Sequence, residues 1–266
     1  MYRNIAKFYD NYTEDVDYEA LADLLERFFA EFGNEGLKNI AAGGKSSGAE
    51  SNGSDISKST LVMDVGCGTG VLTKIMSRRG YDMTGLDASL EMLEAARCDE
   101  TGNNILWLCQ DMTEMDTYGS YAAMYCLEDG VNHLLSRKSL EAFVRRAYNF
   151  IDRGGIIIFD FLRRSYFEAA AETGVFLDDN DDGTCVWTAD YNSRSHIIKY
   201  DLICYKELEN GLFERLDDTV REHAWEPAEL GKILESNGFE LLCLKNRAFE
   251  QAGEGDGRQY VAARRK

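Results

Sequence analysis

The sequence has few positive charges for its size. Its 266 residues include 29 Lys and Arg against 47 Asp and Glu, which gives a formal net charge of −18. Nucleic acids and anionic lipid surfaces are held largely by basic side chains that pair with phosphates. The shortage of these side chains argues against a nucleic-acid partner and against attachment to a membrane surface.

The chain also lacks a C-x-x-C pair, because its seven cysteines are scattered. This spacing indicates neither a zinc site nor a disulfide framework, so we expect free thiols and no metal. No apolar stretch approaches the ~18–20 residues that span a bilayer. The polar, acidic N-terminus is unlike a signal peptide. The sequence therefore predicts a soluble, cytoplasmic protein.

The first sixty residues divide into two parts. Apolar residues three and four apart predict an amphipathic helix over 17–32, within an N-terminal helical cap over 1–40. Residues 41–60 are rich in Gly, Ser and Asn and have almost nothing to bury, so we expect a flexible loop there.

From residue 61 onward, short apolar runs alternate with helical patterns. The expected strands are 61–66, 81–87, 104–111, 121–127 and 156–161, and the longest helix is 139–151, closed by Gly154 and Gly155. Strands without polar alternation, separated by helices, are typical of a parallel sheet covered on both faces. Residues 61–183 are therefore predicted to form a cofactor-binding core.

The pattern changes after residue 183. Segments 184–192, 196–208 and 211–225 alternate like strands and are joined by short turns, which predicts an antiparallel meander over 184–225. One face of this meander would carry His196, Ile198, Tyr200, Leu202 and Cys204. A helix beginning near Pro227 and a strand pair, 239–246 with 258–265, would complete the core over 226–266. The predicted fold is thus a doubly wound, Rossmann-like α/β sheet with an N-terminal helical segment and a β-meander insertion.

A glycine-rich turn, Asp64-Val65-Gly66-Cys67-Gly68-Thr69-Gly70, ends the first core strand. Glycines allow the backbone to turn tightly and to approach a ligand, and the following helix offers its N-terminal amides. Asp87 closes the second strand, where an acidic side chain can accept hydrogen bonds from ribose hydroxyls. An ordinary strand-to-helix turn is the alternative, but this context favours a nucleotide-type cofactor.

Acidic residues in and near this turn indicate the charge of the cofactor. The spacing is G-x-G-x-G after Asp64, and a carboxylate there would repel a pyrophosphate but attract an ammonium and a sulfonium. Opposite charges about 4 Å apart are worth several kcal/mol at an effective dielectric constant near 20. Asp111, after the third strand, could accept from an adenine amino group. Three acids at three strand ends suit a net-cationic ligand better than a dinucleotide.

The motifs together resemble those of class I S-adenosylmethionine-dependent methyltransferases. The resemblance lies in residues 61–97, in Gln110-Asp111-Met112, in YCLEDGVNHLL (125–135) and in DRGGIIIFDF (152–161). The opening residues 1–22 are similar to a bacterial small-molecule subgroup with an N-terminal Tyr-Asp motif. The resemblance covers nearly the whole chain, departs most at 41–60, and implies methyl transfer to a small-molecule acceptor.

The resemblance also implies where S-adenosylmethionine would bind. Asp64 would face its ammonium group through water, and Asp87 would hold its ribose. The other residues that the resemblance assigns to the cofactor are Gly66, Cys67 and Gly68 along the methionine part, the backbone of Cys126 and Leu127 at the methionine end, Ala88, Met92, Asp111 and Met112 around the adenine, and Tyr9 over the cofactor.

Methyl transfer from a sulfonium is an in-line displacement that needs alignment and exclusion of water more than a dedicated catalytic residue. His133, which follows Asp129 after the fourth strand, could act as a base or bind the acceptor, and His223 could face the cleft from the meander. Structural roles are the alternative for both histidines. Glu128 and Asp129 favour a cationic or amine acceptor.

Two further features leave alternatives open. Residues 178–183 match the start of a calcium loop, but Ala189 stands where a bidentate Glu is required, so we expect a solvated turn. The aromatic content of the meander suits a lid, a homodimer face or simply its own packing. The alternative functions are an NAD(P)-dependent oxidoreductase, which the glycine spacing disfavours, and a non-catalytic cofactor-binding or assembly protein.

Overall fold

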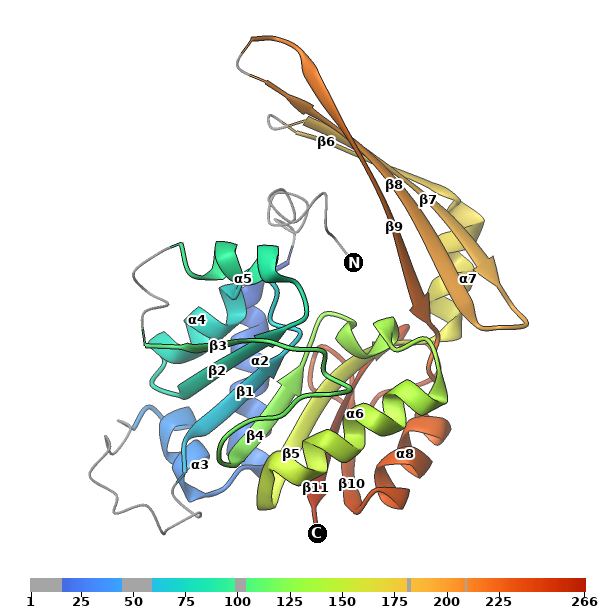
Figure 1. The fold of residues 1–266 in the computed structure, drawn as a ribbon. Helices are drawn as coiled ribbons and strands as arrows, with labels where there is room; N and C mark the ends of the chain where they lie inside the picture. The colour runs from blue at the N-terminus through green and yellow to red at the C-terminus, as the bar shows by residue number, and fades with distance from the viewer. Residues whose placement is uncertain (1–15, 45–58, 99–103, 181–182, 209) are drawn as a thin grey trace.

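The computed structural model describes residues 16–44, 59–98, 104–180, 183–208 and 210–266, and they form two sheets (Figure 1). The larger sheet has seven strands in the order β10-β11-β5-β4-β1-β2-β3. Its strands are β1 (Leu61–Val65), β2 (Asp82–Asp87), β3 (Leu106–Cys109), β4 (Tyr121–Cys126), β5 (Ile151–Leu162), β10 (Phe239–Lys245) and β11 (Arg258–Arg265). The first five strands are parallel, and β11 joins them antiparallel to β5, which confirms the predicted α/β fold.

Helices cover both faces of the seven-stranded sheet (Figure 1). The helices α2 (Tyr18–Phe32), α3 (Glu35–Ala41), α4 (Val71–Arg78) and α5 (Leu90–Ala96) contribute to one apolar cluster, and α6 (Arg137–Phe150) and α8 (Pro227–Ser236) contribute to the other. Successive strand residues point to opposite faces. Ile156 and Ile158 accordingly join the first cluster, whereas Ile157 and Phe159 join the second. This double burial explains why the strands lack polar alternation.

The smaller sheet is antiparallel and extends away from the core (Figure 1). It has four strands rather than the predicted three, namely β6 (Val175–Asn180), β7 (Gly183–Asn192), β8 (Ile197–Glu207) and β9 (Phe213–His223). The helix α7 (Arg164–Thr173), which precedes β6, was not predicted either. We call this four-stranded unit the inserted sheet. Its exposed side chains include Leu177 and Phe213, and a homodimer through this sheet stays a prediction.

One local prediction was wrong. Gly154 and Gly155 do not close α6, which ends at Phe150; they lie within β5, where Gly154 has φ +82° and the pairing with β4 shifts register. The glycines therefore form an irregularity at the start of a strand. In the predicted loop over 41–60, α3 reaches Ala41, and residues 45–58 lie outside the described residues.

The prediction that all cysteines are free thiols was also wrong. Cys185 on β7 and Cys204 on β8 stand directly opposite each other in the antiparallel pairing and form a disulfide. The other five cysteines are free. In the part of the chain that the structure describes, no helix is long and apolar enough to cross a bilayer.

Candidate functional site

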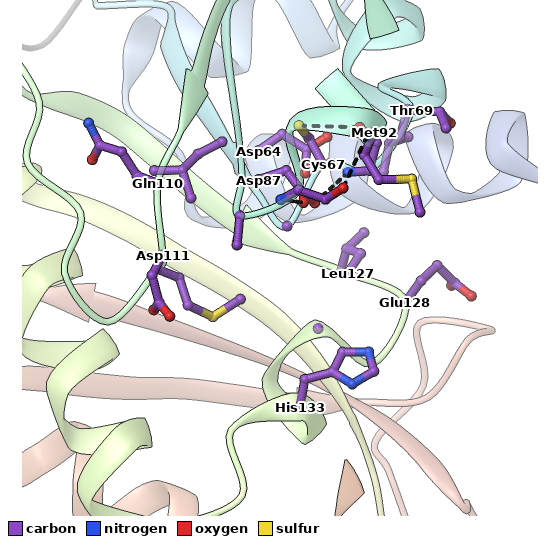
Figure 2. A pocket seen from close by; sticks show the side chains of 18 of the residues that line it. Asp64, Cys67, Thr69, Asp87, Met92, Gln110, Asp111, Leu127, Glu128 and His133 are labelled. Atoms are coloured by element: carbon purple, nitrogen blue, oxygen red, sulfur yellow. Dashed lines mark hydrogen bonds between the residues drawn. The ribbon is translucent and has the colours of Figure 1, made fainter. Parts of the chain in front are cut away.

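A cavity of about 650 Å³ opens where β1, β2, β3 and β4 reach their carboxyl ends (Figure 2). Such a volume is typical of small-molecule sites. Ten of the twelve residues predicted to contact a cofactor line it: Asp64, Gly66, Cys67, Gly68, Asp87, Ala88, Met92, Asp111, Met112 and Leu127. Cys126 is buried and is not among the lining residues, and Tyr9 lies outside the described residues.

The glycine-rich turn forms one wall of the cavity. Gly66, Gly68 and Gly70 have φ of +76°, +53° and +77°, a left-handed conformation that other residues adopt at a cost. The backbone N–H groups of Gly66 and Cys67 both donate to the Leu86 carbonyl, at 2.7 and 3.0 Å, which ties the turn to β2. A Cβ atom built on Gly68 would meet nothing within 4 Å. The turn therefore presents bare backbone to an open space.

Asp87 is fixed in orientation at the end of β2. One carboxylate oxygen accepts from the Gly68 N–H at 2.9 Å, and the other accepts from the Ser89 N–H at 2.8 Å. Burial raises the pKa of this carboxyl, while the two backbone donors lower it. Each carboxylate oxygen can accept a further hydrogen bond. Asp87 is thus held ready to accept from ligand hydroxyls.

Asp64 lies deeper, below the glycine-rich turn. Its side chain is 4% exposed, and one oxygen accepts from the hydroxyls of Thr73, at 2.5 Å, and Tyr125, at 3.0 Å. Burial raises its pKa to about 7, against the opposing effect of both hydrogen bonds. The carboxyl is therefore partly protonated near neutrality rather than fully charged.

Asp111 occupies the rim of the cavity, two residues beyond β3. Its carboxylate accepts from both the N–H and the hydroxyl of Thr113, each at 2.7 Å, which fixes its direction. Met112 follows it in the lining, and Met92 lies on the other side of the cavity (Figure 2). A polar edge and two thioether side chains can together accommodate a flat aromatic ring.

Charged and titratable side chains gather at the end of the cavity formed by the residues that follow β4. His133 lies across the cavity from Asp87 and Cys67 (Figure 2), on the 3₁₀ helix η4 (Gly130–His133). Burial lowers its pKa, which favours the neutral imidazole, while Asp129 has the opposite effect. Glu128 and Asp129, just before η4, have φ of +55° and +54°. Non-glycine residues in this conformation often mark functional sites.

Arg258, from β11, connects the acids at this end. Its guanidinium donates to Asp129 at 2.7 Å, contacts Glu128 at 3.5 Å and pairs with the fully buried Asp160. Burial raises the pKa of Asp160 to about 7, although Arg258 lowers it. Neither Arg258 nor Asp160 was predicted as a site residue. Asp160 lies in the segment DRGGIIIFDF, but no sequence signal indicates that Arg258, 98 residues later, pairs with it.

His223 has a different environment from the one we predicted. Its ring stacks on Trp225 with the centroids 4.2 Å apart, and it is not among the lining residues. Its neighbour Glu222 is the one that approaches His133 and Asp129, with a ligand atom of each residue within 4.8 Å of the others.

Comparisons with known proteins agree with this geometry. Residues 62–155 match the family model described as a methyltransferase domain. The chain therefore contains a methyltransferase domain, and its fold is that of solved S-adenosylmethionine-dependent methyltransferases. The domain match favours a methyltransferase over the oxidoreductase that the sequence left open.

Relatives of this methyltransferase extend the match beyond the family model. A protein from Geobacillus sp. (strain WCH70), described as a methyltransferase, is 23% identical over 91% of this chain and 90% of its own. The structure of a methyltransferase from Clostridium acetobutylicum ATCC 824 covers 99% of this chain and 98% of its own, with a TM-score of 0.79 at 18% identity. The sugar N-methyltransferase KedS8 from Streptoalloteichus sp. ATCC 53650 covers 97% of this chain and 93% of its own, with a TM-score of 0.69 at 16% identity. At these identities the structures show a shared fold.

The cavity fits S-adenosylmethionine, the cofactor that the descriptions of the similar solved structures name. The open space above Gly68 leaves room for the methionine part, and Asp87 has unused acceptor capacity for ribose hydroxyls. The acids near both groups suit a ligand that carries an ammonium and a sulfonium.

Proposed function

We propose that this methyltransferase transfers the methyl group of S-adenosylmethionine to an amine of a small molecule by in-line displacement. The observation that carries the proposal is that one cavity is lined both by the glycine-rich turn with Asp87 and by Glu128 with His133. Cofactor and acceptor would therefore meet in a shared space, shielded from water.

The cofactor would be held by the residues that line the turn and the three strand ends. Asp87 would accept from the ribose hydroxyls, and Asp64 would face the ammonium group through water. The remaining proposed contacts are the backbone of Gly66, Cys67, Gly68, Cys126 and Leu127 at the methionine part, with Ala88, Met92, Asp111 and Met112 around the adenine. Tyr9 stays a prediction outside the described residues.

The bound cofactor supplies an already activated methyl group, so the protein has to align the acceptor and exclude water. Alignment alone can contribute about 7–11 kcal/mol to the barrier. A protonated amine cannot attack, and the neutral His133 is placed to take its proton. In that step the N–H bond breaks, its electron pair stays on nitrogen, and His133 becomes an imidazolium beside Asp129.

Two observations favour an amine over other small acceptors. Glu128 lines the cavity with His133, and Asp129 and Glu222 approach His133. Arg258 pairs with Glu128, Asp129 and the buried Asp160. An excess of carboxylates attracts a cationic acceptor. KedS8, whose fold covers nearly the whole chain, is a sugar N-methyltransferase.

Calorimetry with S-adenosylmethionine tests the cofactor half of the proposal. Asp87→Ala should weaken binding at least about tenfold, because it removes a half-buried, oriented acceptor. Asp82→Ala is the matched control, since Asp82 is exposed at the opposite end of the same strand, and it should leave the affinity unchanged. The absence of binding by the unmodified protein would contradict the proposed function.

Product analysis tests the acceptor half. Small amines, amino sugars among them, and their hydroxyl analogues are incubated with S-adenosylmethionine, and the methylated products are identified by mass spectrometry. We expect N-methylation of at least one amine and none of its hydroxyl analogue. Methylation of hydroxyl or thiol groups alone would refute the assignment to amines while leaving methyl transfer intact.

A further inference from the structure

Glu222 is an unusual residue for the inserted sheet. It lies one residue before the end of β9, and its side chain is only 5% exposed. Within the described residues, its Oε2 atom has no hydrogen-bond partner. A buried carboxylate without a partner is costly in free energy, by several kcal/mol when charged. Its position therefore calls for a cationic partner that the protein itself does not provide.

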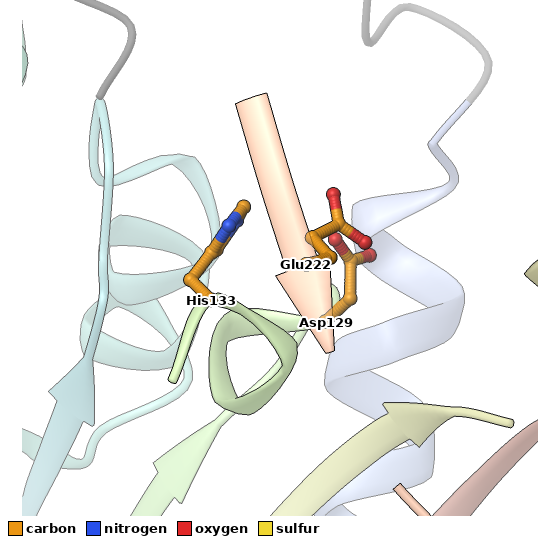
Figure 3. A group of neighbouring side chains, drawn as sticks. All are labelled: Asp129, His133 and Glu222. Atoms are coloured by element: carbon orange, nitrogen blue, oxygen red, sulfur yellow. The ribbon is translucent and has the colours of Figure 1, made fainter. Parts of the chain in front are cut away.

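Glu222 is directed toward two residues of the core. Figure 3 shows its carboxylate beside that of Asp129, with the His133 imidazole extending toward the same space from the neighbouring turn. One ligand atom from each of the three residues lies within 4.8 Å of the other two. The three side chains come from η4, from the residue before it and from β9, so docking of the inserted sheet against the core creates the group.

The charges around this group do not balance. Glu128, Asp129 and Asp160 contact Arg258, and no ion pair of Glu222 is found among the described residues. Burial, together with the nearby Asp129, raises the pKa of Glu222 well above its usual value. Without a ligand this raised pKa favours the neutral acid, and a bound cation would favour the ionised carboxylate.

We propose that Glu222, Asp129 and His133 form a subsite that binds the ammonium group of the acceptor before methyl transfer. This inference rests on the proposed function, and it assigns acceptor selection to a residue of the inserted sheet. The two carboxylates and the neutral imidazole would each accept one N–H from the ammonium group. Substrates with a hydroxyl in place of the amine would leave the buried Glu222 carboxylate without a cation.

The three ligand atoms lie within 4.8 Å of one another, which is close enough for all three to contact one ammonium group. Charge-assisted N–H···O distances of about 2.8 Å around a tetrahedral nitrogen separate the acceptors by about 4.6 Å. Bonds of about 2.1 Å to Zn²⁺ or Mg²⁺ place opposite ligands about 4.2 Å apart, whereas bonds of about 2.4 Å to Ca²⁺ place them about 4.8 Å apart. Arg258 already donates to one oxygen of Asp129 at 2.7 Å, so one further positive charge is enough to balance the three-residue group.

A matched pair of ligands tests the subsite. The full-length protein is saturated with S-adenosylhomocysteine and titrated with cyclohexylamine or cyclohexanol, which have similar shapes but differ in charge. Binding is followed by nuclear magnetic resonance. We expect the amine to bind at least about tenfold more tightly than the alcohol, and Glu222→Gln to remove most of this preference. Glu91→Gln is the control, because Glu91 is a carboxylate that lines the cavity but is exposed and bonded to Ser89.

The outcomes separate this inference from the proposed function. Equal binding of amine and alcohol by the unmodified protein, or a preference that survives both Glu222→Gln and Asp129→Asn, would overturn the subsite. Binding of Mn²⁺ that displaces the amine would make it a metal site instead and would also overturn it. Affinity for S-adenosylhomocysteine, measured for every variant, reports on folding, and its absence in the unmodified protein would refute the proposed function itself.

Discussion

Asn132 joins the inserted sheet to the core, so its removal should destabilise the protein strongly. The side chain is fully buried in η4. Its amide nitrogen donates to the carbonyls of Leu162, at 2.9 Å, and His223, at 2.8 Å, and its oxygen accepts from the Leu162 N–H at 2.9 Å. Leu162 ends β5 and His223 ends β9, so one amide connects both sheets.

Asn132→Ala leaves three backbone groups without their partner. A buried group that loses its hydrogen bond costs about 1–3 kcal/mol. The two Leu162 groups are almost inaccessible to water and should bear the full penalty, whereas the carbonyl of half-buried His223 should regain some solvent contact. We therefore expect a loss of about 4 kcal/mol in the free energy of unfolding, a large share of the stability of a typical domain.

Urea unfolding followed by circular dichroism measures this loss. Asn237→Ala is the matched control, because the Asn237 side chain bonds locally to Ile233 and Ser236 at the end of α8. It should cost no more than about 1 kcal/mol. If both variants unfold at similar urea concentrations with unchanged slopes, Asn132 does not hold the two sheets together and the reasoning fails.

Two further predictions concern the glycine-rich turn and the acid below it. Gly70→Ala should lower the melting temperature far more than Gly119→Ala. Both glycines have positive φ, so the backbone strain is similar. A Cβ on Gly70 would stand 2.4 Å from the Trp107 ring, whereas one on Gly119 would meet nothing within 4 Å. Equal shifts would mean that backbone strain alone matters. Because the folded-state pKa of Asp64 is about 7 against 3.8 for the model carboxyl, the folded state binds the extra proton, and stability should fall as the pH rises from about 4 to 7. Asp64→Asn should remove most of this pH dependence and stabilise the protein at pH 8 by up to about 4 kcal/mol. If the free energy of unfolding falls equally in the variant and the parent between pH 4 and 7, the prediction is contradicted.

The core was predictable because its pattern is local. Uninterrupted apolar strands separated by amphipathic helices specify a parallel sheet, and a glycine-rich turn after the first strand specifies the edge where ligands bind. Asp64 and Asp87 follow from the same logic, since both end strands that the sequence delimits well. The sequence could not predict that Asp64 lies under the turn, because its partners Thr73 and Tyr125 come from two other elements.

The disulfide depends on the strand register between β7 and β8. Cys185 lies seven residues before Asn192 and Cys204 seven residues after Ile197, and Asn192 pairs with Ile197 at the end of the hairpin. The sequence analysis identified both strands and the turn between them. Counting outward from the predicted strand ends, 192 and 196, places Cys185 opposite Ile203, one residue short of Cys204. Pairing the two cysteines therefore requires the observed register, in which Asn192 faces Ile197.

The register between β8 and β9 likewise shows on which face of the inserted sheet Glu222 lies. In an antiparallel pair, directly opposite residues share a face. Glu222 pairs with Ile198, so it belongs to the face that carries Ile198, Leu202 and Cys204, all of them buried. A carboxylate on an apolar face is an exception to binary patterning, and such exceptions are expected where function requires them. The sequence alone could not supply its neighbours, because Asp129 lies 93 residues earlier in the chain, on a turn of the other sheet. Only the docking of the inserted sheet turns an anomalous strand residue into one component of a cation site.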